Sequence, residues 1–305
     1  MRKIILIVCL LLLRTTVFAG DGYQFLRVGV TARATGLGDV FVAQPGDATT
    51  FMYNPAGLAT LQGRTFAASY MNHILDIGSG FASYVQPLPR WGGNIGVGIT
   101  YFTYGEFEGY DANGAATSSF HANDMAWHVF YARMLDEHIS VGGTFKYIRS
   151  TIDEFTSSAW AMDAGVQYSP EERVRLGIVL LNAGFVSDPF IRHKESLPLS
   201  LQAGVNYKLR NAPVTVNLTF TDIQNDLIKS PVVGAEWMLH ESWSVRLGYS
   251  LQRDRELHAG SSDFLDRMAG ASAGIGFKYD KYIVDYSFAS WGIGTLNRFS
   301  IQYQF

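Results

Sequence analysis

Apolar residues alternate with polar or small residues along most of the chain, from about residue 64 to the C-terminus. In one such segment, Trp243, Val245 and Leu247 alternate with Ser244 and Arg246. Alternation with a period of two is the pattern of a β-strand whose two faces meet different surroundings. It predicts fourteen strands, at 64–72, 77–87, 93–105, 121–134, 138–150, 157–168, 172–182, 198–209, 213–222, 231–239, 242–252, 269–279, 282–289 and 296–305.

The connections between these strands differ in length in a regular way. Those after even-numbered strands are short, as at 135–137 and 280–281, whereas those after odd-numbered strands include 106–120, 183–197 and 253–268. An even number of strands with short periplasmic turns and long outer loops is typical of a bacterial outer-membrane β-barrel. Such a chain would start and finish on the periplasmic side. A soluble sandwich or propeller also alternates, but it offers no reason for this parity.

Composition favours strands that face lipid. Hydrophobic residues make up 48% of the chain and charged residues only 17%, where about 25% is usual in a soluble domain. After residue 19, no segment approaches the roughly 20 apolar residues of a transmembrane helix. Charge on a lipid-facing position is costly, so the polar face of the strands is predicted to line the lumen. Its charged members are Lys146, Asp163, Lys208, Arg246, Asp285 and Arg298; the aromatic residues expected at the membrane interfaces are Tyr70, Tyr84, Tyr101, Tyr207, Trp243 and Tyr282.

Residues 1–19 have the pattern of a secretory signal peptide. Arg2 and Lys3 precede the apolar stretch 4–13, and 17–19 form a small-residue cleavage site. The mature chain is therefore expected to begin at Gly20 and to reside in the cell outer membrane. Its net charge would fall from -3 to -6, because the signal contains three basic residues and no acid. An acidic chain without a basic block argues against nucleic acid as a partner.

Residues 20–63 do not alternate, and Asn54-Pro55-Ala56-Gly57 lies at the centre of a segment rich in Gly, Ala and polar residues. Pro55 lacks a backbone donor and biases Asn54 away from helix, so this motif predicts a turn. Irregular backbone ahead of a barrel finds hydrogen-bond partners in the lumen, which lipid denies it. We therefore expect a plug, or hatch, at 20–63 inside a barrel at 64–305, as a fixed plug rather than a mobile gate.

The segment FLRVGVTARATGLGDVFVA, followed by DATTFMYNPAGLA, resembles the N-terminal signature of the PorV/PorQ family of outer-membrane proteins. A second stretch, which starts at YGEFEGYDANG and includes FHANDMAWHVFYARMLDEHISVGGTFKYIRS, resembles the PorQ branch more than the PorV branch. This family is itself similar to transporters of the FadL type, which carry an Asn-Pro-Ala hatch inside a fourteen-stranded barrel. The resemblance covers the mature chain and implies a component or accessory of type IX protein secretion.

Signals for catalysis or metal binding are weak. Cys9, in the signal peptide, is the only cysteine, and the seven histidines lack the spacing of metal ligands. Asp124 and His128 lie on one inward face of a strand, and Ser140 or Ser300 could supply a nucleophile only through the fold. Polar lumen residues more often form a satisfied hydrogen-bonded network. The sequence therefore predicts no enzyme, no cofactor and no metal site.

The outer loops are the best candidates for contact with partners, because loops on a rigid scaffold often carry function. The preferred hypothesis is a docking platform that engages cargo or surface-attachment proteins of type IX secretion. The alternative is FadL-like passive uptake of a hydrophobic small molecule, and contact with lipopolysaccharide is a simpler role for the same loops. The loop residues that combine aromatic and cationic character are Phe107, Tyr110, Phe185, Phe190, Arg192, Lys194, Arg253, Arg255 and Phe264.

Overall fold

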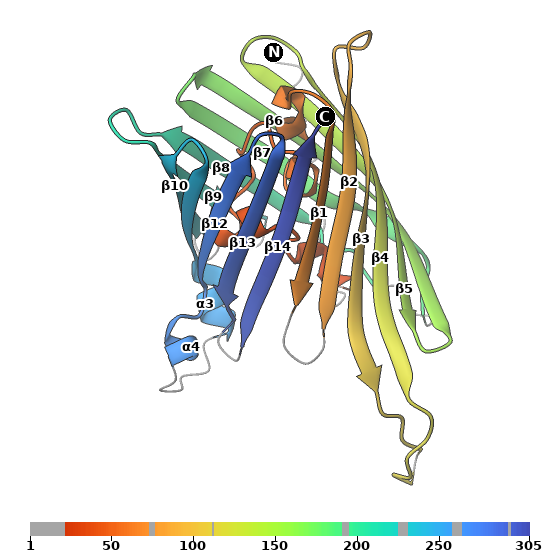
Figure 1. The fold of residues 1–305 in the computed structure, drawn as a ribbon. Helices are drawn as coiled ribbons and strands as arrows, with labels where there is room; N and C mark the ends of the chain where they lie inside the picture. The colour runs from red at the N-terminus through yellow and green to blue at the C-terminus, as the bar shows by residue number, and fades with distance from the viewer. Residues whose placement is uncertain are drawn as a thin grey trace.

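The computed structural model describes residues 22–72, 77–111, 113–190, 195–224, 231–257, 264–291 and 294–305. Consecutive strands pair antiparallel, and β1 also pairs with β14, which closes the predicted barrel of fourteen strands (Figure 1). The predicted signal peptide lies outside the described residues. The strands are β1 (Thr65–Asn72), β2 (Gly78–Leu88), β3 (Gly93–Phe107), β4 (Phe120–Met134), β5 (Ile139–Ile152), β6 (Phe155–Glu171), β7 (Val174–Asp188), β8 (Ser200–Lys208), β9 (Val214–Phe220), β10 (Pro231–His240), β11 (Trp243–Ser250), β12 (Ala271–Tyr279), β13 (Tyr282–Ser290) and β14 (Thr295–Gln304).

The long connections gather at one end of the barrel, at the bottom of Figure 1. We call this the outer end and the opposite end the inner end. The connection between β5 and β6 breaks the predicted parity: it consists of two residues, since these strands themselves extend far toward the outer end. β7 likewise continues to Asp188, so the predicted loop 183–197 begins as strand.

The predicted strand 242–252 and loop 253–268 were wrong in detail. β11 ends at Ser250, and helices α3 (Leu251–Leu257) and α4 (Phe264–Arg267) follow it at the outer end. The Ser250 hydroxyl accepts a hydrogen bond from the backbone N–H of Arg253 at 3.2 Å, which satisfies a free donor in the first turn of α3.

The two faces of the wall separate as the alternation predicts. Outward side chains such as Val97 and Leu247 are 54% and 62% exposed, whereas Arg246, Asp285 and Arg298 are buried on the inward face. The buried Lys146 ammonium lies 2.8 Å from the Asp163 carboxylate and donates to Asn182 Oδ1 at 2.7 Å. Lys208, at the inner end of β8, is exposed. Lys146 and Arg246 are thus paired with carboxylates and Lys208 lies at the rim, whereas the buried Arg298 donates to the Thr35 hydroxyl of the hatch.

The segment before β1 fills the lumen with short helical turns, drawn in red and orange in Figure 1. These are η1 (Gln24–Arg27), α2 (Ala32–Gly36), η2 (Thr50–Met52) and η3 (Pro55–Thr60). The Gly22 N–H donates to Ser196 O at 3.0 Å, just ahead of the outer end of β8. The hatch therefore runs from the outer end to the inner end, so the expectation of a periplasmic start was wrong for its first described residues.

Two inward glycines let the hatch backbone approach the wall. A Cβ atom on Gly142 of β5 would lie 2.5 Å from the carbonyl carbon of Pro55, and one on Gly165 of β6 would lie 2.0 Å from Asn54 Oδ1. Real side chains do not come so close, so both positions require the absence of a Cβ. A Cβ on Gly143, the neighbour of Gly142 that faces outward, would lie 3.4 Å from Asp163 O, an ordinary contact.

We predict that Gly142→Val displaces the Pro55–Ala56 turn and destabilises the folded barrel by about 1–3 kcal/mol, the usual cost of overpacking. Gly143→Val is the matched control and should leave stability nearly unchanged. The measurement is the midpoint temperature of unfolding in detergent. Unfolding is followed by electrophoresis, as the temperature at which the band of the folded barrel disappears. Equal midpoints for the two variants would show that the hatch does not press against this part of the wall.

Candidate functional site

The Asn-Pro-Ala motif anchors the inner half of the hatch. The Asn54 side chain is fully buried. Its amide nitrogen donates to Val42 O at 2.8 Å and lies 3.3 Å from Val166 O on β6, while its Oδ1 accepts from the Ala56 N–H at 3.1 Å. Asn54 is extended and caps η3, whose first residue is Pro55, a position where the missing proline N–H costs nothing. One amide thus joins the Asn54 turn to the Val42 turn of the hatch and to the wall.

A chain of five buried or half-buried charges crosses from the hatch to the wall. Arg33 of α2 contacts Asp47 of the hatch at 2.9 Å and Glu236 of β10 at 2.8 Å. On the wall, Arg246 continues the chain from Glu236 at 2.7 Å to Asp285 at 2.6 Å. Each arginine lies between two carboxylates, so both cations are paired where water is scarce.

The hatch end of this chain is held by local hydrogen bonds as well. Asp47 Oδ1 accepts from the Thr49 N–H at 2.9 Å and from its hydroxyl at 2.6 Å, and Oδ2 accepts from Gln302 of β14 at 3.2 Å. Burial alone would raise the pKa of Asp47, but Arg33 and the bonds from Thr49 hold that pKa below its usual value. Asp47 therefore remains ionised at neutral pH and keeps the link to Arg33.

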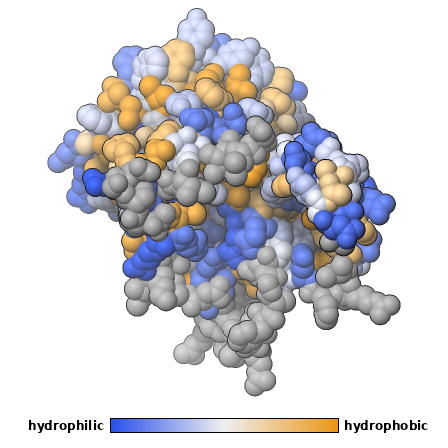
Figure 2. Space-filling model, turned by 90° about the horizontal axis from the view of Figure 1, so that it is seen from below, coloured by the Kyte–Doolittle hydropathy of each residue, from blue (hydrophilic) through white to orange (hydrophobic). Residues whose placement is uncertain are grey.

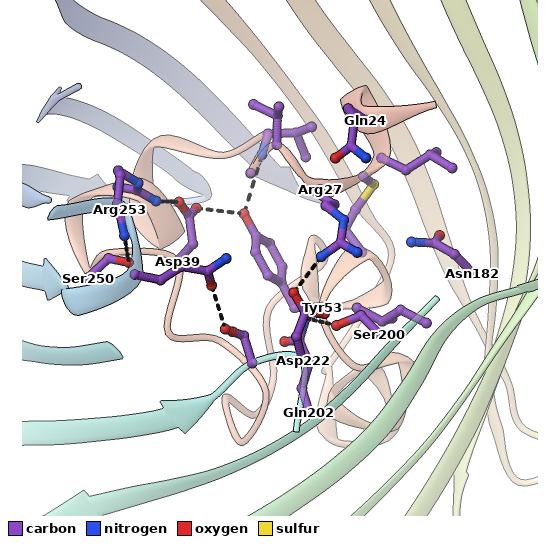
Figure 3. A pocket seen from close by; sticks show the side chains of 18 of the residues that line it. Gln24, Arg27, Asp39, Tyr53, Asn182, Ser200, Gln202, Asp222, Ser250 and Arg253 are labelled. Carbon is purple, nitrogen blue, oxygen red and sulfur yellow. Dashed lines mark hydrogen bonds and ion pairs between the residues drawn. The ribbon is translucent and has the colours of Figure 1, made fainter. Parts of the chain in front are cut away.

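Two further ion pairs join the outer half of the hatch to its surroundings (Figure 3). Arg27 of η1 contacts Asp222, which follows β9, at 2.5 Å. Arg253 of α3 contacts Asp39 of the hatch at 2.8 Å, and Tyr53 donates to the same carboxylate at 3.2 Å. These contacts tie the outer helix α3 and the β9 end to the plug.

Between these pairs lies a cavity of about 400 Å³, which we call the outer cavity. It separates the hatch from the outer ends of β7, β8 and β11 and from α3 (Figure 3). Its polar lining comes from Gln24, Arg27, Asp39, Tyr53, Asn182, Ser200, Gln202, Thr221, Asp222, Ser250, Gln252, Arg253 and Glu256, and its apolar lining includes Leu26, Val28, Val30, Met52, Leu181, Leu257 and Trp291.

The predicted partner-contact residues do not form one surface, and four of them are exposed at the outer end. Phe107 is 42% exposed and stacks on Phe120 with ring centroids 5.3 Å apart, at the base of the long β3–β4 arm that projects at the bottom of Figure 1. Tyr110, further along this arm, is 61% exposed and donates to Glu108 at 2.5 Å. Phe264 and Arg255 are exposed on α4 and α3.

Other members of that set lie elsewhere. Phe185 is on β7 and not in a loop, paired with Trp160 and exposed on the outside of the wall. Phe190 is half-buried just after β7. Arg253, expected on an outer surface, turns inward to Asp39. Arg192 and Lys194 lie outside the described residues.

Of the residues considered for catalysis, Asp124 and His128 are engaged in other contacts. His128 is buried, with its Nε2 3.1 Å from the Thr100 hydroxyl, and Asp124 accepts from Tyr104 at 2.6 Å. The hydroxyls of Ser140 and Ser300 have no hydrogen-bond partner within the described part of the chain. In those same ranges there is no cluster of three His, Cys, Asp or Glu side chains with the arrangement of a metal site. No described helix is both long and apolar enough to cross a membrane.

Sequence reasoning missed the ion pairs of Arg27, Arg33, Asp39, Asp47 and Asp222, which hold the hatch in place. Local signals were the pairs Gly38–Asp39 and Gly46–Asp47, in which Gly38, Asp39 and Gly46 adopt a positive φ, of 79°, 70° and 64°. Gly and Asp are the residue types that tolerate this conformation in turns. The partner of each charge comes from a distant part of the chain.

Comparison with solved structures supports the architecture. The chain is similar to the toluene transporter TbuX of Ralstonia pickettii, with 13% identity over 91% of this chain and 98% of that one, and a TM-score of 0.61. It is also similar to the Pseudomonas putida toluene transporter TodX, with 13% identity, coverage of 95% and 99%, and a TM-score of 0.61. A FadL homologue of Pseudomonas aeruginosa gives 9% identity, coverage of 90% and 98%, and a TM-score of 0.58.

At these identities the similarity concerns the fold, which is that of FadL-type outer-membrane barrels. The sequence matches none of the curated proteins. Residues 15–174 match the family described as type IX secretion system protein PorV. The matched region contains the hatch and the strands from β1 to β6, which is more than half of the chain. The predicted PorQ-like branch stays a prediction, but the chain belongs to the PorV family of outer-membrane β-barrel proteins.

Proposed function

We propose that the protein is a non-enzymatic component or accessory of type IX protein secretion that serves as a docking platform at the outer membrane. Its partners are other secretion proteins, cargo or surface-attachment proteins. The observation that carries this proposal is the anchored hatch: a plug clamped to the wall by Arg33, Asp47 and Asn54 suits a barrel that works through its surface. The outer end supplies that surface, where the β3–β4 arm and α4 present exposed aromatic side chains.

The β3–β4 arm is built as a stiff projection. Asp111 Oδ1 accepts from the Asn113 and Ala115 N–H groups at 2.8 and 2.9 Å, and Tyr110 forms an isolated bridge with Ala116. A pre-ordered arm loses little conformational entropy on binding, and exposed aromatic residues are frequent binding hot spots. The arm therefore has the properties of a contact element for another protein.

Passive uptake of a hydrophobic small molecule is the second candidate. The fold shared with the toluene transporters favours it, and the outer cavity has the size of a small-ligand pocket, about 300–1,000 Å³. Its walls disfavour it, because the Arg27–Asp222 and Arg253–Asp39 pairs would lose water to a hydrocarbon that offers them no hydrogen bonds. The docking function is therefore the better supported of the two.

The docking proposal predicts that a tagged protein, extracted from its native outer membrane in mild detergent, co-purifies with type IX secretion proteins. The double variant Phe107→Ala/Tyr110→Ala should lower that recovery about tenfold or more, because hot-spot aromatics contribute about 2 kcal/mol or more each. Trp91→Ala is the control, since Trp91 is 70% exposed on an inner turn. Recovery of lipid or a hydrophobic small molecule without any secretion protein would instead support uptake.

A closed lumen predicts low permeability that depends on the hatch clamp. Arg33→Met removes the cation shared by Asp47 and Glu236, so we expect the variant to raise the rate at which small sugars enter proteoliposomes. Arg64→Met is the control, because Arg64 is exposed at the junction with β1. The assay is osmotic swelling of the liposomes. Equal swelling rates for wild type and Arg33→Met would contradict a clamp that seals the lumen.

A further inference from the structure

The outer cavity is lined by two ion pairs together with apolar side chains, within a fold that is shared with toluene transporters. Figure 2 looks onto the outer end, where hydrophilic atoms gather around a hollowed centre. The two Arg–Asp pairs approach the cavity from opposite sides, with the amides of Gln202 and Gln252 also in its lining (Figure 3). Donors and acceptors are therefore distributed around the chamber and not confined to one wall.

Two of these polar atoms lack a partner among the described residues. They are Asp222 Oδ1, an acceptor, and Arg253 Nη1, a donor, and both are buried. A buried acceptor and a buried donor that make no hydrogen bond destabilise the folded protein, because each has lost its water. A ligand that both donates and accepts would remove this cost at both sides of the cavity.

The two ion pairs of the cavity favour a neutral ligand, and the remaining acid of the lining, Glu256, is exposed and already accepts from Gln252 Nε2 at 2.9 Å. Asp222 already faces Arg27, and Arg253 already faces Asp39. An ammonium group on Asp222 would be repelled by Arg27, and a carboxylate or phosphate on Arg253 would be repelled by Asp39. A hydroxyl group has no such conflict, since it donates to a carboxylate and accepts from a guanidinium without carrying charge.

The apolar part of the lining fits the same chemistry. Leu26, Val28 and Met52 come from the hatch, and Trp291 follows β13. A sugar ring presents C–H groups on its faces and hydroxyls around its edge. Its face can therefore pack on the apolar side chains of the cavity while its hydroxyls bond to the polar ones. The volume of about 400 Å³ accommodates about one or two such rings.

We propose that the outer cavity binds a neutral saccharide of one or two rings, with hydroxyls on Asp222 and Arg253 and a ring face on the apolar lining. Free saccharide and the terminal sugar of a surface glycolipid present the same groups, and the site accepts this chemistry from either source. The proposal is independent of docking, because a barrel that recovers no secretion proteins would still bind sugar.

The test uses the full-length protein in a detergent without a sugar headgroup, screened against an array of neutral glycans. Hits are titrated by calorimetry beside glycylglycine, inorganic phosphate and toluene. Smooth lipopolysaccharide and its sugar-free lipid A distinguish the two sources: binding of the free glycan alone indicates a soluble ligand, and binding of lipopolysaccharide but not lipid A indicates a glycolipid. Either result supports the proposal.

Gln252→Leu is the test variant, since Gln252 lines the cavity from α3, outside the closed sheet, and its amide can donate to or accept from a sugar hydroxyl. We expect it to raise the dissociation constant of the best glycan about tenfold, which corresponds to about 1.4 kcal/mol. Gln86→Leu, on the exposed inner part of β2, should leave binding unchanged. Absence of any glycan binding, equal affinity of Gln252→Leu and wild type, or tighter binding of glycylglycine, phosphate or toluene would overturn the proposal.

Discussion

The structure depends on one constraint: in hydrocarbon, each backbone N–H and C=O must find its partner within the protein. The pairing of β1 with β14 meets this constraint, because it removes the last free edges of the sheet. A closed sheet in turn creates an interior that cannot be left empty. Side chains of the inward face and the hatch fill it, so the plug is a consequence of closure as much as a device for controlling passage.

Polar groups that enter this interior must be compensated there. The chain Asp47–Arg33–Glu236–Arg246–Asp285 does so by alternating the sign of charge from the hatch to the wall. The same need explains why the Asn54 side-chain amide both donates to and accepts from backbone groups. Together these contacts hold the hatch against the wall of the barrel.

Strand positions were predictable because alternation is local and repeats along the chain. The same holds for the burial of Arg246 and Asp285, which follows from their parity within a strand. The start of α3 was not predictable from this pattern, since Leu251 and Gln252 continue the alternation of β11. Here the Ser250 side chain and packing against the hatch decide the conformation.

The site was less accessible to sequence reasoning. Residue type and parity identified the hatch motif, but the Arg27–Asp222 pair joins positions 195 residues apart. No local pattern marks such a contact, and Arg253 illustrates the difficulty: as a cation in an outer connection it had the character of a surface residue. The fold instead places it within reach of Asp39, where a half-buried carboxylate is stabilised by a counter-charge.

The direction of the hatch has a consequence for assembly. Residues from Gly22 to the start of β1 run the length of the interior, and β1 forms one side of the final seam with β14. A plug of this kind has to enter the lumen either before the first and last strands join or, afterwards, as an unfolded segment through the inner mouth. In both cases its contacts form only once the distant strands that carry their partners, such as β5 and β10, are in place.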